Sequence, residues 1–314
     1  MKGIFHLLDS LRNLTTEEWE AVFVDDSTDG TTEVLTRYCR SESRAVLLAE
    51  AHARTPAEAR NKGVAHCRAN TVAFVDANYS FDKDWLEKAL IHLREPVVAG
   101  VGGGVVLDPK NPYAEALSSW LGSMNSPVFS KCNQVRGTSF LRAQNIVLKR
   151  AVFLEVGGFD PEMRFCEDED LSYRIRQRGY RLLLTDSNVT HHWNVRSFKD
   201  FSCLMLTYGL GRCLAARHCG LALSNSRLVL PLSFASFVVA LIFGTLYWDF
   251  ALAFALLTLY LLTVLTYALA TRLSSARSVA EAVFLYVLGH LSYSLGFFSA
   301  FMPSGIRKRI VVAG

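Results

Sequence analysis

The sequence predicts an α/β domain with a mostly parallel sheet and helices on both faces, followed by helices that cross a membrane. Three short apolar runs rich in β-branched residues, at 21–24, 45–48 and 71–75, are separated by stretches of helical periodicity. This alternation is typical of a parallel sheet covered by helices. Two later runs, 228–248 and 250–270, carry no charged residue and have the length of roughly 20 residues that spans a bilayer core.

Composition narrows the classes of partner. The 314-residue chain has 33 Lys and Arg against 29 Asp and Glu, a formal net charge of +4, and its basic residues form no block. This balance argues against nucleic acid as a partner. The seven cysteines show neither a C-x-x-C pair nor a zinc-type spacing, so we expect them to be reduced and partly buried.

Basic residues near the apolar runs predict how the chain is oriented in the membrane. Arginines at 212–227 precede the first run, and Arg272 and Arg277 follow the second. The positive-inside rule then places the N-terminal domain in the cytoplasm of a multi-pass cell-membrane protein. A third uncharged segment, 282–302, contains glycines and serines and either spans the bilayer or re-enters it. The basic cluster at 307–309 favours re-entry.

The helices of the first domain have recognisable starts. Thr55 precedes Pro56, the arrangement of an N-cap followed by proline at the first helical position, and Asp82 is expected to cap a helix through Trp85. The glycine-rich run 101–106 lacks the remainder of a dinucleotide fingerprint. We expect it to be a strand that other backbone approaches closely.

Two acidic motifs follow predicted strands, where ligands bind in such sheets. In the first, VDDSTDGT, a turn with a helix cap explains residues 27–31, but it explains poorly the adjacent pair Asp25 and Asp26. The second motif, VDAN, contains Asp76 and Asn78.

The densest stretch of polar motifs runs from 149 to 193. A Gly-Gly turn is followed by four consecutive acids at 167–170, which begin a helical pattern and so suit the positive end of the helix dipole. Asp170 is expected to pair with Arg174 one turn later. Crowding raises the pKa of at least one acid, which is the condition that a general base needs, and Asp168 is our candidate base.

These residues carry a resemblance to a known family. The run AQNIVLKRAVFLEVGGFD at 143–160, then EDEDL, RGYRL and a histidine after the next strand, resembles the acceptor half of inverting family 2 glycosyltransferases. The resemblance implies a GT-A fold, which is Rossmann-like, and a nucleotide-sugar donor, UDP- or GDP-linked. It also implies that Glu167 and Asp168 supply the base that deprotonates the acceptor hydroxyl.

The resemblance assigns further residues to the donor. Asp25 and Asp26 match the acids that bind the uracil and ribose, and AEARNKGV matches an A-R-N-x-G element in which Arg60 approaches the diphosphate. Asn145 matches an asparagine beneath the donor sugar. Asn61 either contacts the nucleotide or lies on a solvated helix face; of this element we favour a role for Arg60 alone.

The resemblance also implies a divalent cation, Mg²⁺ or Mn²⁺, on the donor diphosphate. The family holds it with an Asp-x-Asp motif, here Asp76 and Asn78. Because Asn78 lacks a charge, we expect weaker metal affinity. His191 or His192 is expected to complete the ligand shell.

The C-terminal half resembles members that build exopolysaccharides such as succinoglycan on polyprenyl carriers. The Y-G-x-G-R element at 208–212 precedes the apolar runs, and Arg212 either sits near a lipid-linked phosphate or anchors the chain by snorkelling. We expect a catalytic domain at 1–195, an amphipathic interfacial helix and linker at 196–226, and a membrane domain at 227–314.

One feature departs from the family. Its members open with a strand before the first helix, whereas this sequence begins at MKGIFHLLDSLRNL, which has the pattern of that helix. Either the true start lies upstream, which we favour, or the sheet tolerates a gap. For the chain as its sequence stands, weaker donor binding is expected.

The predicted function is transfer of a sugar from a nucleotide sugar to a membrane-associated acceptor hydroxyl, expected to be a lipid-linked glycan, with inversion. Alternatives are a polyprenyl-phosphate sugar synthase and a catalytically impaired relative that acts as a membrane partner, which Asn78 and the absent strand favour. A phospho-receiver domain is poorly supported, because this sequence has no isolated Asp and later Lys at the strand ends where that class requires them.

Overall fold

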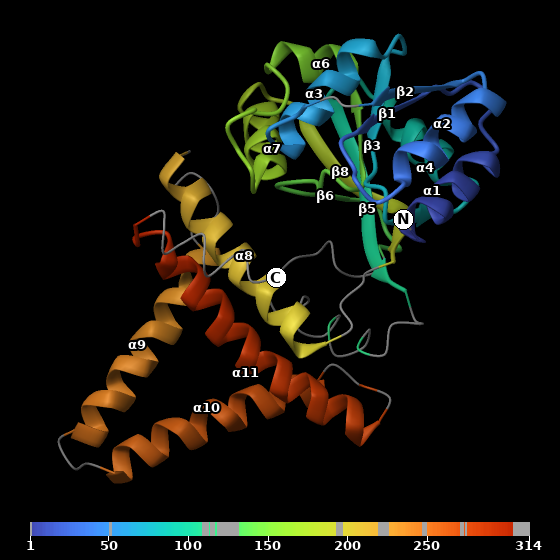
Figure 1. The fold of residues 1–314 in the computed structure, drawn as a ribbon. Coiled ribbons are helices and arrows are strands. Elements are labelled where there is room, and N and C mark those ends of the chain that lie inside the picture. Colours follow the sequence, from blue (N-terminus) through green and yellow to red (C-terminus); the bar gives the residue numbers. More distant parts are fainter. Residues whose placement is uncertain are drawn as a thin grey trace. The chain divides into compact units, whose positions relative to one another are not determined.

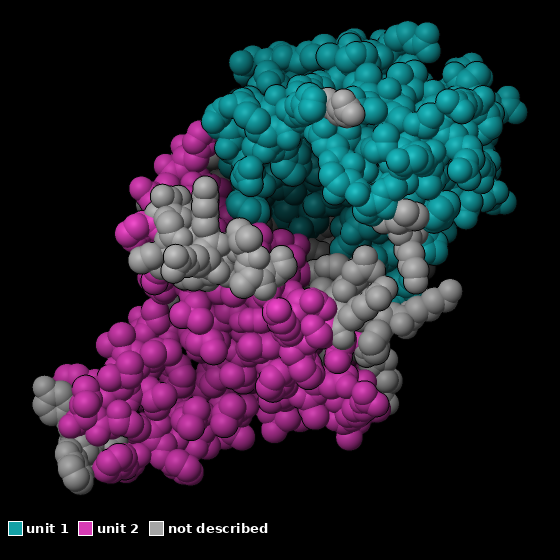
Figure 2. All heavy atoms as spheres, viewed as in Figure 1, with its two compact units in different colours: residues 1–108, 127–193 teal, residues 109–126, 194–314 magenta. Residues whose placement is uncertain are grey.

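The computed structural model describes residues 2–49, 52–108, 113, 117, 132–192, 197–218, 226–246, 250–270, 273 and 275–303. The chain forms two compact units, which Figure 2 colours separately: unit 1 comprises residues 1–108 and 127–193, and unit 2 comprises 109–126 and 194–314. The predicted donor, metal and base residues all belong to unit 1. Arg212 and the apolar helices belong to unit 2.

Unit 1 is an α/β domain in which α1, α2 and α4 lie on one side of the strands and α3, α6 and α7 on the other (Figure 1). The predicted fold class is confirmed. Its elements are α1 Lys2–Arg12, β1 Ala21–Asp25, α2 Thr31–Ser41, β2 Ala45–Ala49, α3 Pro56–His66, β3 Thr71–Phe74, β4 Tyr79–Phe81, α4 Trp85–Leu93, β5 Val98–Leu107, β6 Arg136–Gly137, β7 Ile146–Lys149, α6 Arg150–Glu155, α7 Glu167–Gln177 and β8 Arg181–His191.

The strands form two sheets with mixed directions. β1 and β2 pair in parallel, and the second sheet has the order β3-β7-β5-β8-β4, with β6 also paired to β8. In the second sheet β5 and β8 are parallel, whereas β7 runs antiparallel to both β3 and β5. Parallel pairing is therefore less extensive than the apolar runs predicted, because β7, β4 and β6 enter the sheet in the opposite direction.

The first and third predicted strands, β1 and β3, belong to different sheets. Side chains flanking β1 connect it to the rest of unit 1: Glu20 Oε1 accepts hydrogen bonds from the backbone N–H groups of Arg68 and Ala69 at 2.6 and 2.9 Å. Within the described residues, β1 has one strand partner, β2.

The glycine-rich run is confirmed as a strand, β5, that neighbouring backbone approaches closely. A Cβ atom added at Gly103 would lie 1.9 Å from the carbonyl oxygen of Ser187, and one at Gly102 would lie 2.4 Å from that of Asn145. Glycine is therefore required for β5 to lie between β7 and β8.

The predicted helix starts are partly confirmed. The Thr55 hydroxyl accepts from Glu58 N at 3.1 Å, as an N-cap does. The prediction for Asp82 is wrong: Asp84 occupies the N-cap position of α4, and Asp82 accepts from Trp85 N through its backbone oxygen instead. The extra turn between β4 and α4 moves the helix start by two residues.

Unit 2 is helical, with α8 Phe198–His218, α9 Ser226–Leu246, α10 Phe250–Ala270 and α11 Ala276–Ser299. Among the described helices, α10 and α11 are long and apolar enough to cross a membrane, and α9 contains a shorter apolar stretch, Leu232–Leu246.

The helix α8 packs closely on α11 in unit 2. A Cβ added at Gly209 would lie 1.9 Å from Tyr293 O, and Ser202 and Ser292 share a hydrogen bond of 2.7 Å. The five consecutive residues 209–213 are buried. This half of α8 does not show amphipathic burial, because a helix with one exposed face does not bury five residues in a row. The predicted position of α8 at the membrane surface stays a prediction.

Candidate active site

The Arg60 side chain joins the two acidic motifs of unit 1. Its Nη2 donates to Asp76 Oδ1 at 2.9 Å, and its Nη1 donates to Glu167 Oε1 at 2.7 Å. The guanidinium carbon lies 5.5 Å from the centre of the Phe159 ring, and the side chain is 13% exposed. The end of β3 and the start of α7 therefore meet at one half-buried cation.

Local contacts position Arg60 from the α3 side. The neighbouring Asn61 side chain donates to Phe159 O at 2.7 Å and accepts from Phe159 N at 3.0 Å. The Thr55 hydroxyl also donates to Pro161 O at 2.9 Å. These bonds attach α3 to the segment after the Gly-Gly turn, and they commit the Asn61 amide to the protein rather than to a nucleotide.

The four acids form the first turn of α7, as predicted. Burial, followed by the charge of Asp168, raises the pKa of Glu167 to about 7, although Arg60 acts in the opposite direction. The raised pKa therefore falls on Glu167, and burial is its first cause, ahead of the crowding that the sequence predicted. Asp170 pairs with Arg174 at 2.6 Å, as expected.

Asp168 lies half-buried beside Glu167. Its Oδ1 accepts from Glu169 N at 2.9 Å, and its Oδ2 accepts from Ala143 N at 3.4 Å. Two backbone donors thus orient this carboxylate. The sequence analysis did not predict the contact with Ala143, because almost every residue has a backbone N–H and the residue type therefore does not indicate which one donates.

The residues around Asp76 fit a cation that arrives with a diphosphate. Asp76 is 37% exposed and Asn78 adds an amide oxygen, and Mg²⁺ commonly takes one or two protein oxygens and completes its shell with phosphate oxygens and water. In the part of the chain that the structure describes, no group of three or more His, Cys, Asp or Glu side chains is arranged to hold a metal alone.

The two histidines at the end of β8 bond to different partners. His191 is buried, lies 4.3 Å from the Tyr79 ring centre and bonds through Nε2 to Asn78 Nδ2 at 2.7 Å. Burial, followed by the charges of His192 and Arg142, lowers the pKa of His191 to about 4. His191 is therefore neutral at pH 7. Its role as a ligand stays a prediction, because its Nε2 would have to give up the hydrogen bond to Asn78 in order to bind the cation.

His192 contacts protein partners through both of its ring nitrogens. Its Nε2 lies 2.8 Å from Ser80 Oγ and its Nδ1 lies 2.8 Å from Asp108 Oδ2, and its ring stacks on that of His6 at 3.9 Å. Because both nitrogens already have protein partners, the role of His192 as a ligand stays a prediction that requires one of these bonds to break.

The predicted donor residues have distinct local roles. Asp25 accepts from the Thr32 hydroxyl at 2.6 Å, and Asp26 accepts from the backbone N–H groups of His52 and Ala53 at 2.8 and 2.9 Å. The bond from Ala53, followed by that from His52, lowers the pKa of Asp26. Both acids stabilise loops at the carboxyl ends of β1 and β2, and their contact with a donor stays a prediction.

Asn145 is a core residue. It is 1% exposed, accepts from Trp85 Nε1 at 3.0 Å and donates to Ser187 O at 2.8 Å. The Asn145 amide is thus satisfied inside the domain, and its contact with the donor sugar stays a prediction. Arg212, predicted on the acceptor side, is buried within α8 of unit 2.

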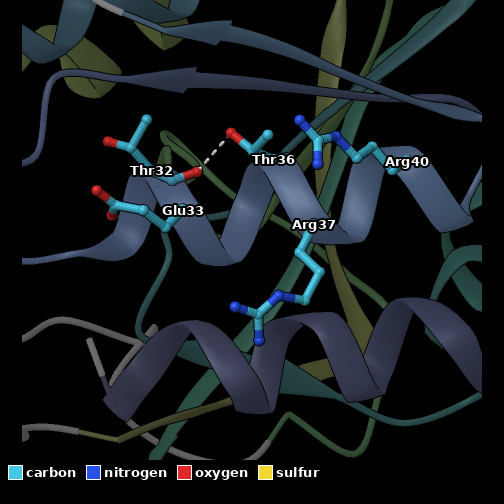
Figure 3. Close-up of a pocket in the computed structure, with 5 residues that line it drawn as sticks. All are labelled: Thr32, Glu33, Thr36, Arg37 and Arg40. Atoms are coloured by element: carbon cyan, nitrogen blue, oxygen red, sulfur yellow. Dashed lines mark hydrogen bonds between the residues drawn. The ribbon is translucent and has the colours of Figure 1, made fainter.

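A cavity of about 320 Å³ lies elsewhere on unit 1. It is lined along α2 by Thr32, Glu33, Thr36, Arg37 and Arg40. Figure 3 shows the two arginines extending from α2 in different directions. The cavity contains none of the predicted site residues.

Comparison with known proteins shows what this chain is similar to. A family model described as glycosyl transferase family 2 matches residues 3–157. The Pre-mycofactocin glycosyltransferase of Mycobacterium tuberculosis (strain CDC 1551 / Oshkosh) is 32% identical over 226 residues, covering 69% of this chain but 45% of its own length. The chain thus spans about half the length of that relative.

Two further matches cover more of the matched protein's own length. The Succinoglycan biosynthesis protein ExoA of Rhizobium meliloti (strain 1021) is 24% identical over 251 residues, covering 77% of this chain and 74% of ExoA. The mannosyltransferase PcManGT of Pyrobaculum calidifontis, solved with GDP-Man and Mn²⁺, superposes with a TM-score of 0.63 at 19% identity, covering 93% of this chain and 83% of that one. These comparisons show that residues 3–157 form a glycosyl transferase family 2 domain, and the structural match shows that the chain has the GT-A fold.

Proposed function

We propose that the chain transfers a sugar from a nucleotide-sugar donor to an acceptor hydroxyl with inversion at the anomeric carbon. The observation that carries this proposal is the Arg60 link, which holds Asp76 and Glu167 at 2.9 and 2.7 Å from one guanidinium. Arg60 thereby brings Asp76, which is suited to a donor diphosphate, close to the acids at the start of α7, which are suited to a base. A shared site for both substrates is what direct transfer between them requires.

In the proposed reaction Asp168 accepts the proton of the acceptor hydroxyl. That oxygen attacks the anomeric carbon on the face opposite the diphosphate, a new carbon–oxygen bond forms, and the bond to the diphosphate breaks. Asp76 and Asn78 would hold Mg²⁺ or Mn²⁺, which when bound neutralises charge on the leaving group. Arg60 adds a fixed positive charge beside Asp76, where it favours binding of a diphosphate.

Asp168 suits the base better than Glu167 does. Glu167 has the raised pKa, but it is 8% exposed and bonded to Arg60. Asp168 is half-buried and directed by two backbone N–H groups. Glu167 then acts by holding Arg60.

The experiment compares Asp168→Asn, Glu167→Gln and the control Asp186→Asn, whose side chain is half-exposed on β8. Membranes containing each full-length variant receive UDP- and GDP-sugars with Mn²⁺, and released nucleoside diphosphate is measured. Asp168→Asn is expected to lower turnover by about 10²–10⁴-fold, with donor affinity and the control unchanged. Retained turnover in Asp168→Asn would contradict the assignment of the base.

We further propose that the acceptor is a lipid-linked glycan at the cytoplasmic face of the cell membrane. The apolar helices α10 and α11 and the similarity to a succinoglycan biosynthesis protein support this. Supplying membrane extracts with labelled donors and analysing the lipid fraction by mass spectrometry tests it. Label that enters only free sugar would exclude a lipid-linked acceptor.

A further inference from the structure

Two residues of unit 1 adopt a backbone conformation that side chains normally avoid. His52 has φ 49° and Cys166 has φ 61°, and they are the only non-glycine residues with positive φ in the described parts of the chain. The steric clash of Cβ with the following carbonyl disfavours this left-handed region. Such strain concentrates at functional sites, where surrounding contacts hold it in place.

The left-handed turn at His52 faces Asp26. The successive backbone N–H groups of His52 and Ala53 donate to the two carboxylate oxygens of Asp26 at 2.8 and 2.9 Å. Successive N–H groups in such a turn form a concave anion site, and here the anion is the Asp26 side chain. The strain at His52 thereby fixes the loop beyond β2 to the carboxyl end of β1.

The left-handed residue Cys166 is the N-cap of α7. Its φ of 61° and ψ of 19° differ from the extended conformation usual at an N-cap. Its carbonyl accepts from the N–H groups of Glu169 and Asp170, both at 3.1 Å. The direction in which the chain enters α7 decides where Glu167 and Asp168 point, because they are the next two residues.

We infer that His52 and Cys166 are positioning residues whose left-handed backbone serves two separate steps of the reaction. His52 holds the Asp26 loop for donor binding, and Cys166 directs the Glu167–Asp168 pair for proton transfer. This inference rests on the proposed function. It separates the two positions kinetically, since a backbone change at 52 alters donor affinity and one at 166 alters turnover.

The experiment substitutes each position with valine, which avoids the left-handed region, and with glycine, which adopts it freely. The controls are Cys67→Val, where the backbone is extended with φ −75°, and His66→Val at the end of α3. Cys166→Thr is a second β-branched variant. Purified full-length protein is titrated with UDP and GDP in the presence of Mn²⁺, and diphosphate release from UDP-glucose and GDP-mannose gives kcat.

His52→Val is expected to weaken nucleotide binding about tenfold with kcat unchanged, as loss of hydrogen bonds to a charged group does. Cys166→Val and Cys166→Thr are expected to lower kcat about 10²-fold with nucleotide affinity unchanged. The glycine variants keep both values and gain about 2 °C or more in Tm. Retained nucleotide binding in the Cys166 variants also shows that they fold.

Two results would overturn the inference alone: valine variants that match wild type, or glycine variants as impaired as the valine ones, since the side chain and not the backbone would then matter. A wild-type chain that binds and turns over no donor overturns the proposed function, and this inference with it.

Discussion

Arg60 brings opposite charges into contact in the interior of unit 1. Its side chain is 13% exposed, and its partners Asp76 and Glu167 come from positions 16 and 107 residues away in the sequence. Charges removed from water interact strongly but lose hydration. Such a link therefore makes the position of each acid depend on the other, while adding little net stability.

Removing the cation alone is expected to be costly. Arg60→Gln leaves Asp76 and Glu167 without their shared cation and should lower the free energy of unfolding by about 2 kcal/mol, because Asp76 is partly exposed to water. Urea denaturation measures the change. The matched control is Arg54→Gln, because Arg54 pairs with Glu58 with its side chain 68% exposed, and it should change stability by less than about 1 kcal/mol. Equal changes in unfolding free energy at both positions would show that the Arg60 contacts stabilise the fold no more than an exposed ion pair does.

Glu167 predicts a dependence of stability on pH. Its pKa is raised from 4.5 to about 7, so the folded state favours the protonated acid. This contribution is complete below about pH 4.5 and is lost as the pH rises towards about 7. Wild type should therefore lose stability relative to Glu167→Gln between about pH 5 and 7, as measured by denaturation at several pH values. A constant difference would mean that Glu167 titrates normally in the fold.

The strand β5 depends on glycine at its contact with β8. Ser187 O would lie 1.9 Å from a Cβ at Gly103, whereas nothing lies within 4 Å of one at Gly137 on β6. Backbone cannot move aside as a flexible side chain can. A side chain can therefore be added at Gly137 but not at Gly103, although both glycines belong to the same sheet.

Gly103→Ala is expected to lower the unfolding free energy by about 3 kcal/mol, because the new methyl group forces β5 and β8 apart. Gly137→Ala should change it by less than about 0.5 kcal/mol. Thermal and chemical denaturation of both variants compare the costs. If Gly103→Ala proved as stable as Gly137→Ala, the close packing of β5 would be refuted.

Local patterns predicted many elements correctly. β1, β2 and β3 fall on the predicted apolar runs, and α7 begins at the four acids. Strand pairing was less predictable: β3 pairs antiparallel with β7, which lies more than 70 residues later. Periodicity reports which face of a strand is apolar, but it carries no information on the neighbour's identity.

Unit 2 exposes large apolar side chains along its helices. Leu246 is 70% exposed and Phe254 is 72% exposed, far more than water-facing helices usually show over a contiguous surface. A hydrocarbon environment would cover these side chains. These exposed side chains support the proposal that the chain is inserted in a membrane.

The full-length protein is expected to remain in the membrane fraction after washes with high salt and with alkaline carbonate, and to be released by detergent. Salt removes proteins held by charge, whereas apolar helices are retained by burial in lipid. Immunoblots of each fraction, with a known peripheral protein as control, measure this. Release by carbonate would exclude stable membrane insertion.

The sequence alone determined the fold class, the apolar helices and the acidic start of α7, because each depends on residues close together along the chain. Tertiary structure decided the long-range partners of the functional side chains. Only the folded chain brings Arg60 between Asp76 and Glu167, buries Asn145 and bonds both nitrogens of His192. The physical reason is that burial, charge compensation and left-handed backbone at His52 and Cys166 depend on contacts between distant segments, and these leave no local pattern in the sequence.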